Sequence, residues 1–187
     1  MAVAHISIPK IGEHVNGDAV LVRSDAAGSW LLAVVDGLGH GPAAAEASQR
    51  AIACLAGLEL SQPLFVSMQA VHAQLRGTRG AAATVCVLRG LKIESCAVGN
   101  VQLSCINAAV PLVLSSGVLG VRVAKFRVCE ANLKGGTRLA MFSDGISSKF
   151  RLDESRNLAP QQACKLTIER HRKQEDDSTI LIADLEG

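Results

Sequence analysis

Residues 30–41 read WLLAVVDGLGHG, and this stretch decides how the chain folds. The six apolar residues from Trp30 to Val35 form a continuous run with the length of a strand that is buried on both faces. The run stops at Asp36-Gly37, a pair typical of a tight turn. Pro42 follows the glycines and suits the first position of a helix. The stretch therefore predicts a buried strand, an acidic turn and a helix in direct succession.

The rest of the chain supplies strands before this stretch, a second helix after it, and then many short apolar runs separated by Gly or Asn. We expect strands at 4–8, 19–23, 30–35, 83–88, 91–98, 101–106, 111–114, 121–128, 138–142 and 178–184, and helices at 43–58, 63–76 and 158–170. The runs from 83 to 114 resemble an antiparallel meander. Because strands and helices do not alternate regularly, the order predicts an α+β fold, a four-layer α-β-β-α sandwich of two antiparallel sheets flanked by helices.

Composition narrows the class of protein. Of the 187 residues, 49% are hydrophobic, which excludes a disordered tail, and 3% are aromatic, which argues against the stacking platforms of single-stranded nucleic-acid binding. The net charge of +2 predicts no strong attraction to polyanions. The basic run at 165–173 is interpreted as the solvated face of a helix. We expect one domain spanning 1–187, with no nucleic-acid partner.

The six cysteines form no CxxC pair and mostly lie within apolar runs, so they are interpreted as core residues in a reducing compartment. The N-terminus lacks the pattern of a signal peptide, and no apolar run is long enough to span a bilayer. These features predict a cytoplasmic protein without membrane contact.

The positions of the aspartates are the most informative feature for chemistry. Asp36 and Asp144 each follow an apolar run, whereas Asp18 and the pair Asp176-Asp177 each precede one. Carboxylates gathered at one end of a core would repel one another and raise their pKa values. A hard divalent cation such as Mg²⁺ or Mn²⁺ resolves that repulsion, and two such ions can activate a water and clamp a phosphoryl group. Taken singly, each Asp-Gly has the plainer interpretation of a turn.

Five motifs in order resemble those of the PPM phosphatases, in their SpoIIE-like branch. They are Asn16-Gly17-Asp18, Val35 to Gly41 followed by Ala43-Ala44, Gly99-Asn100, Phe142 to Ile146, and Asp176 to Leu181. The motifs extend from about residue 16 to residue 184, so the resemblance covers nearly the whole chain. It implies a serine/threonine phosphatase in which a metal-bound hydroxide attacks the phosphate directly.

The resemblance also implies roles for individual residues. Asp36 would bridge two Mn²⁺ or Mg²⁺ ions, with help from the backbone carbonyl of Gly37. Asp18 would hold the second ion, and Asp144 with Asp176 would hold the first. Asp177 is expected at the metal site as well, supporting the ligands around it, and the sequence does not decide which of Asp176 and Asp177 binds the ion directly. Asp36 and Asp18 are thus the expected catalytic residues, and the cysteines are expected to have no part in catalysis.

Within this branch the chain resembles the RsbX-like phosphatases of the bacterial stressosome, because its motifs begin by residue 16 and leave no room for a sensor module. The implied partners are phosphorylated STAS-domain scaffold proteins, whose dephosphorylation resets stress signalling, and the implied state is a monomer or weak dimer. Alternatives are a phosphatase-like docking module with little activity, a two-metal hydrolase of small phosphoesters, and a structural protein whose Asp-Gly turns are incidental.

The chain departs from the family pattern at two points. Many members carry a basic residue near the start that grips the phosphate, and only Lys10 and His14 are candidates here. Asn100 stands where many members have an aspartate, and this replacement argues against a third metal site. Asn100 is interpreted as a hairpin residue, and His40 as a residue that orders the turn after Asp36 rather than one that acts directly.

Overall fold

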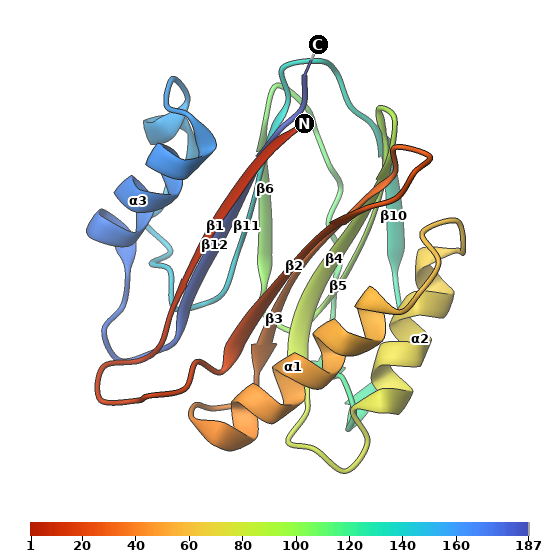
Figure 1. Cartoon of the computed structure of the whole chain (residues 1–187), viewed down its shortest axis with the longest axis vertical. Coiled ribbons are helices and arrows are strands. Elements are labelled where there is room, and N and C mark those ends of the chain that lie inside the picture. Colours follow the sequence, from red (N-terminus) through yellow and green to blue (C-terminus); the bar gives the residue numbers. More distant parts are fainter. Residues whose placement is uncertain (187) are drawn as a thin grey trace.

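The computed structural model describes residues 1–186 and arranges them in four layers (Figure 1). One sheet has the strand order β1-β12-β11-β6, and the other has the order β10-β5-β4-β3-β2, with β7 beside β5. Helices α1 and α2 cover the second sheet and α3 covers the first. The predicted α-β-β-α sandwich of antiparallel sheets is confirmed. In the part of the chain that the structure describes, no helix is long and apolar enough to cross a membrane.

The elements lie close to the predicted positions in most of the chain. The strands of the first sheet are β1 (Ala2–Ile8), β6 (Gln102–Ile106), β11 (Arg138–Phe142) and β12 (Ser178–Asp184). Those of the second are β2 (Asp18–Ser24), β3 (Trp30–Gly37), β4 (Ala81–Arg89), β5 (Lys92–Val98), β7 (Leu114–Ser115) and β10 (Val128–Asn132). The helices are α1 (Pro42–Ala56), α2 (Leu64–Gln74) and α3 (Pro160–His171), and η1 (Leu152–Ser155) is a short 3₁₀ turn.

Strand β3 shows why the sandwich forms. Alternate side chains of a strand point to opposite faces. Leu31, Ala33 and Val35 pack in the core beneath α1 and α2, whereas Leu32 and Val34 pack in the core between the two sheets. A third core lies between the first sheet and α3. Because β3 is buried on both faces, its apolar run is continuous rather than alternating.

The predicted meander is wrong at its third strand. Strands β4 and β5 form an antiparallel hairpin, but β6 pairs with β11 in the opposite sheet. The chain crosses between the sheets at Gly99-Asn100, and Val101, which is fully buried, packs into the core between them. Asn100 is therefore not a hairpin residue, and the crossing brings it to one end of both sheets.

Two predicted strands are largely absent. Of 111–114, only Leu114 is paired, in the two-residue β7, and Pro111 lacks the N–H that a ladder needs. Of 121–128, only Arg122–Val123 (β9) is paired before β10 begins, and it forms a small hairpin with Gly117–Val118 (β8). Phe126 instead packs edge-on against Phe65 of α2, with ring centres 6.0 Å apart. That contact draws the segment over α2 and away from the sheet.

The pairing of β1 with β12 brings the two ends of the described chain together. Ala2 lies opposite Asp184, whereas Ile8 lies opposite Ser178 at the other end of the pair. Figure 1 shows β1 beginning and β12 ending at the same end of the sandwich, away from the end at which β3 leads into α1.

We predict that Met141→Ala lowers the free energy of unfolding by about 2–5 kcal/mol, because it opens a cavity in the core between the sheets. Met141 is fully buried there, whereas Leu91 is 48% exposed, so Leu91→Ala serves as the matched control. Chemical denaturation measures both. Equal, small losses for the two variants would contradict the assignment of the inter-sheet core as the main support of the sandwich.

Candidate functional site

Two aspartates come from neighbouring strands of the second sheet. Asp18 begins β2, Asp36 lies near the end of β3, and the antiparallel register places them directly opposite each other. Asp36 lies two and four residues after Val34 and Leu32, so its side chain is on the same face of β3, the face that packs between the sheets. The two carboxylates therefore stand where the inter-sheet core ends.

Two more aspartates come from the first sheet. Asp144 follows β11 and Asp176 precedes β12, and these strands are antiparallel neighbours. The end of one and the start of the other therefore lie at the same edge. That edge meets the Asp18–Asp36 edge of the opposite sheet, so each sheet contributes two of these four carboxylates.

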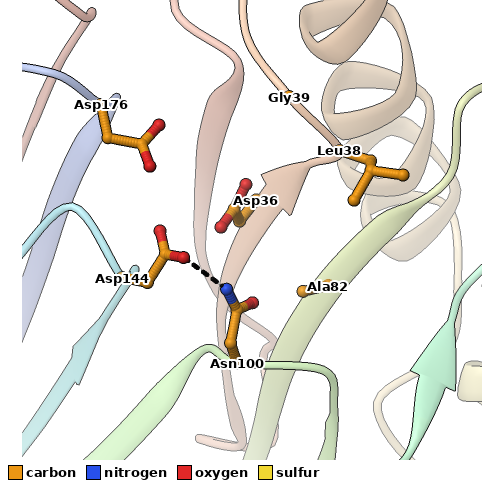
Figure 2. A pocket seen from close by; sticks show the side chains of 7 residues that line it. All are labelled: Asp36, Leu38, Gly39, Ala82, Asn100, Asp144 and Asp176. Atoms are coloured by element: carbon orange, nitrogen blue, oxygen red, sulfur yellow. Dashed lines mark hydrogen bonds between the residues drawn. The ribbon is translucent and has the colours of Figure 1, made fainter.

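The carboxylates of Asp36, Asp144 and Asp176 line one small pocket of about 120 Å³ (Figure 2). The wall is completed by Leu38, Gly39, Ala82 and Asn100. In Figure 2 the three carboxylates point into the same space from three different elements. The volume is several times that of one water molecule and is suited to a phosphoryl group with a water beside it.

Asp18 lies behind the pocket wall and is only 3% exposed. Its Oδ2 accepts a hydrogen bond of 2.7 Å from the hydroxyl of Ser143, and its buried Oδ1 has no hydrogen-bond partner among the described residues. Burial raises the pKa of Asp18 to about 7. A buried acceptor left without a partner is costly unless something else satisfies it.

Burial also raises the pKa of Asp36 to about 8, and the charges of the four neighbouring aspartates add to that rise. The pKa of Asp144 is raised by burial and by the charge of Asp176, although Lys173 and Asn100 oppose the rise. The carboxylates are thus close enough to disfavour one another's ionised forms. The direction of these shifts agrees with the repulsion expected from their positions at the strand ends.

The structure distinguishes Asp176 from Asp177. Asp176 lines the pocket, whereas Asp177 is 3% exposed and does not. The two carboxylate oxygens of Asp177 accept hydrogen bonds from the backbone N–H groups of Lys10 and Gly17, at 2.8 and 3.0 Å. Asp177 therefore ties the turn that precedes β2, and hence Asp18, to the start of β12.

Gly37 is buried next to Asp36, and a Cβ atom there would lie 2.0 Å from the carbonyl oxygen of Ala44. Only glycine allows α1 to approach the end of β3 so closely. His40 is exposed and bonds Glu13 through its Nδ1 at 2.6 Å, outside the lining of the pocket. This contact agrees with an ordering role for His40 in the turn after Asp36.

Two residues that hold the aspartates, Asn100 and Ser143, were not among the predicted site residues. Asn100 donates a 2.6 Å hydrogen bond from Nδ2 to Oδ2 of Asp144 (Figure 2), because the crossing between sheets brings it there. Ser143 donates to Asp18 and accepts from the backbone N–H of Thr179. Asn100 could have been assigned to the site only from the order of the strands. The position of Ser143 next to Asp144 was a signal for its role that the sequence already contained.

The interpretation of 165–173 as one solvated helix face is wrong at its end. Helix α3 stops at His171, and Lys173 lies beyond it in the loop that leads to Asp176. The Lys173 ammonium donates a 2.6 Å hydrogen bond to the backbone carbonyl of Asp144. The last residue of the basic run therefore belongs to the site.

The chemistry of the donors fits a hard divalent cation. All the side chains are carboxylates, Asp18 has a buried oxygen without a partner, and mutual repulsion disfavours the ionised state that a cation would favour. Within residues 1–186, no three His, Cys, Asp or Glu side chains lie as close together as the ligands of one ion. The aspartates thus fit an ion in charge and atom type, without forming a closed cage around one point.

The sequence matches the family model described as Stage II sporulation protein E (SpoIIE) over residues 26–186. Comparison with curated protein sequences gives no match. One solved structure, described as "The bacterial stressosome: a modular system that has been adapted to control secondary messenger signaling", is 29% identical, with a TM-score of 0.90 and 97% of each chain covered.

Two further structures share the fold at lower identity. RsbX, solved in complex with magnesium, is 20% identical with a TM-score of 0.83, over 96% of this chain and 92% of that one. The catalytic domain of the serine/threonine phosphatase PstP, solved with two manganese ions, is 18% identical with a TM-score of 0.80, over 99% and 98% of the chains. Both neighbours carry divalent ions on the same architecture.

We predict that Asp36→Asn raises the melting temperature of the metal-free protein at pH 8. The pKa of Asp36 is about 8 in the folded chain and near 3.8 when unfolded, so wild type loses stability as pH rises from about 4 to 8. Asn does not ionise and therefore removes that loss of stability. The difference in melting temperature between variant and wild type should shrink towards pH 4. Thermal unfolding in chelator measures it.

The exposed carboxylate of Glu59 provides the control, since Glu59→Gln should leave the melting temperature unchanged. Mn²⁺ should raise the melting temperature of wild type and of Glu59→Gln more than that of Asp36→Asn. A metal-free Asp36→Asn protein that melts below wild type at pH 8 would show that the carboxylates do not repel one another as described.

Proposed function

The chain belongs to the SpoIIE family of PPM serine/threonine phosphatases, and from this membership we propose that it dephosphorylates phosphoserine and phosphothreonine in STAS-domain scaffold proteins of a bacterial stressosome. The observation that carries the proposal is the carboxylate pocket between the two sheets. The stressosome structure at 29% identity supports the choice of substrate protein. The same proposal places the protein in the cytoplasm, as one catalytic domain over residues 1–187.

Asp36 is the central ligand in this proposal, since it lines the pocket and lies opposite Asp18. Asp36 and Asp18 would hold one ion with the carbonyl of Gly37, and Asp36 would share a second ion with Asp144 and Asp176. Asp177 supports these ligands through its backbone contacts rather than by ligation. Mn²⁺ and Mg²⁺, the ions present in PstP and RsbX, suit the oxygen donors.

When bound, the ions would supply Lewis acidity toward the phosphoryl group and an activated water. Side chains of the protein hold the aspartate ligands in position. The amide of Asn100 orients Asp144, and the hydroxyl of Ser143 orients Asp18 while accepting from the backbone of β12. Fixed ligands of this kind avoid reorganisation during the reaction.

No side-chain nucleophile is required. The pKa of Cys86 and of Cys164 is raised by burial to about 12, so their reactive thiolates are suppressed at neutral pH. The pocket is lined by no cysteine among residues 1–186. These settings agree with a core role for the cysteines.

We predict that wild type releases phosphate from a phosphoserine-bearing STAS-domain protein with Mn²⁺ or Mg²⁺ and not with chelator. Asp36→Asn should lower kcat/KM by about a thousandfold or more, because the ions' several kcal/mol of transition-state stabilisation is lost. Glu59→Gln should match wild type. Phosphate release measured on the STAS protein, on phosphoserine peptides, and on nucleotides and sugar phosphates ranks the substrates.

Each alternative has its own outcome in this experiment. A docking module would bind the STAS protein without metal-dependent release of phosphate. A hydrolase of small phosphoesters would prefer nucleotides or sugar phosphates to any phosphoprotein. A structural protein would show neither turnover nor stabilisation by metal.

A further inference from the structure

A larger groove adjoins the carboxylate pocket and has no role in the proposed chemistry. It encloses about 460 Å³ and shares Asn100 and Asp144 with the pocket, so the two spaces lie next to each other. The pocket itself encloses only about 120 Å³. A phosphorylated side chain that enters the pocket must therefore leave its flanking residues outside it, and the groove is the adjoining space.

The walls of the groove suit a short piece of peptide. Phe142 and Phe150 line the groove and meet edge to face, with ring centres 5.2 Å apart, so they offer apolar surface. Gln102, Ser104 and Ser147 also line it and offer hydrogen-bonding groups. Apolar surface with a few placed polar groups is typical of ligand sites.

Lys173 is the one cationic residue among those that line the groove. An ammonium group has three donors, and one of them bonds the carbonyl of Asp144. In the described part of the chain, the structure gives its Nζ no other hydrogen bond or ion pair. A half-buried cation with spare donors at the wall of a groove favours an anionic ligand.

On the basis of the proposed function, we propose that Lys173 is a specificity determinant that binds an acidic residue next to the phosphorylated residue of the substrate. The anion occupies the groove while the phosphate occupies the pocket. The charge of Asp144 would oppose an acidic ligand, and cations bound by the aspartates would offset that charge. The ligand class is therefore an acidic phosphopeptide rather than an isolated phosphate ester.

The test uses the full chain with Mn²⁺ and a set of phosphoserine peptides. In the set, each neighbour of the phosphoserine is changed in turn to Glu, Gln or Lys. For wild type, kcat/KM should be roughly fivefold higher with Glu than with Gln at one or more of these positions, as for a partly exposed ion pair. Lys173→Met should abolish that preference and Lys173→Glu should transfer it to the Lys peptide.

Lys165 lies exposed on α3, so Lys165→Met is the matched control and should keep the wild-type ranking. Lys173 also holds the backbone of Asp144, and a purely structural role would lower turnover of all peptides by the same factor. The diagnostic readout is therefore the ratio of kcat/KM between the Glu and Gln peptides, not the value of kcat/KM for any one peptide. It should also fall as salt rises.

An unchanged peptide ranking in Lys173→Met and Lys173→Glu would overturn the specificity role while leaving the phosphatase function intact, because the Gln peptide would still be hydrolysed. Absence of metal-dependent turnover of every peptide by folded wild type would overturn the proposed function and the groove assignment together. Loss of the Glu preference in Lys173→Met, with the control unchanged, would support the assignment.

Discussion

Asp18 and Asp36 face each other across an antiparallel strand pair, at the edge of a layer that apolar side chains fill elsewhere. Their repulsion is unfavourable to folding, and burial makes it worse because water screens it less. The protein offsets part of this cost with the hydroxyl of Ser143, which donates a hydrogen bond to Asp18. A bound cation would offset much more. The stability of the sandwich and its capacity for chemistry thus depend on the same few oxygen atoms.

Close backbone packing is what allows aspartates from two sheets to converge. A Cβ at Gly145 would lie 1.9 Å from the carbonyl oxygen of Asp177, and a Cβ at Gly17 would lie 2.6 Å from that residue's carboxylate. These glycines bring the turns before β2, after β11 and before β12 into direct contact. The glycines beside Asp18, Asp36 and Asp144 therefore do more than form turns, since they set the spacing between ligands on separate strands.

Much of this arrangement was predictable, because continuous apolar runs mark strands buried on two faces and aspartates at their ends are easy to locate. The layers and most helices followed from that pattern. Asn100 and Lys173 were not predictable in the same way. Asn100 reaches Asp144 only because β6 joins the opposite sheet, and Lys173 reaches it only because α3 ends at His171. Both depend on long-range topology, which local periodicity does not encode.

The pairing of β1 with β12 has a consequence for how such a domain can be combined with others. Both ends of the described chain lie at one end of the sandwich (Figure 1), whereas the strand ends that carry the aspartates lie at the other. A sensor, a receiver or an affinity tag fused to either terminus would therefore emerge on the side remote from the substrate. The architecture is modular in this sense: partners can be exchanged at the termini without rebuilding the catalytic end.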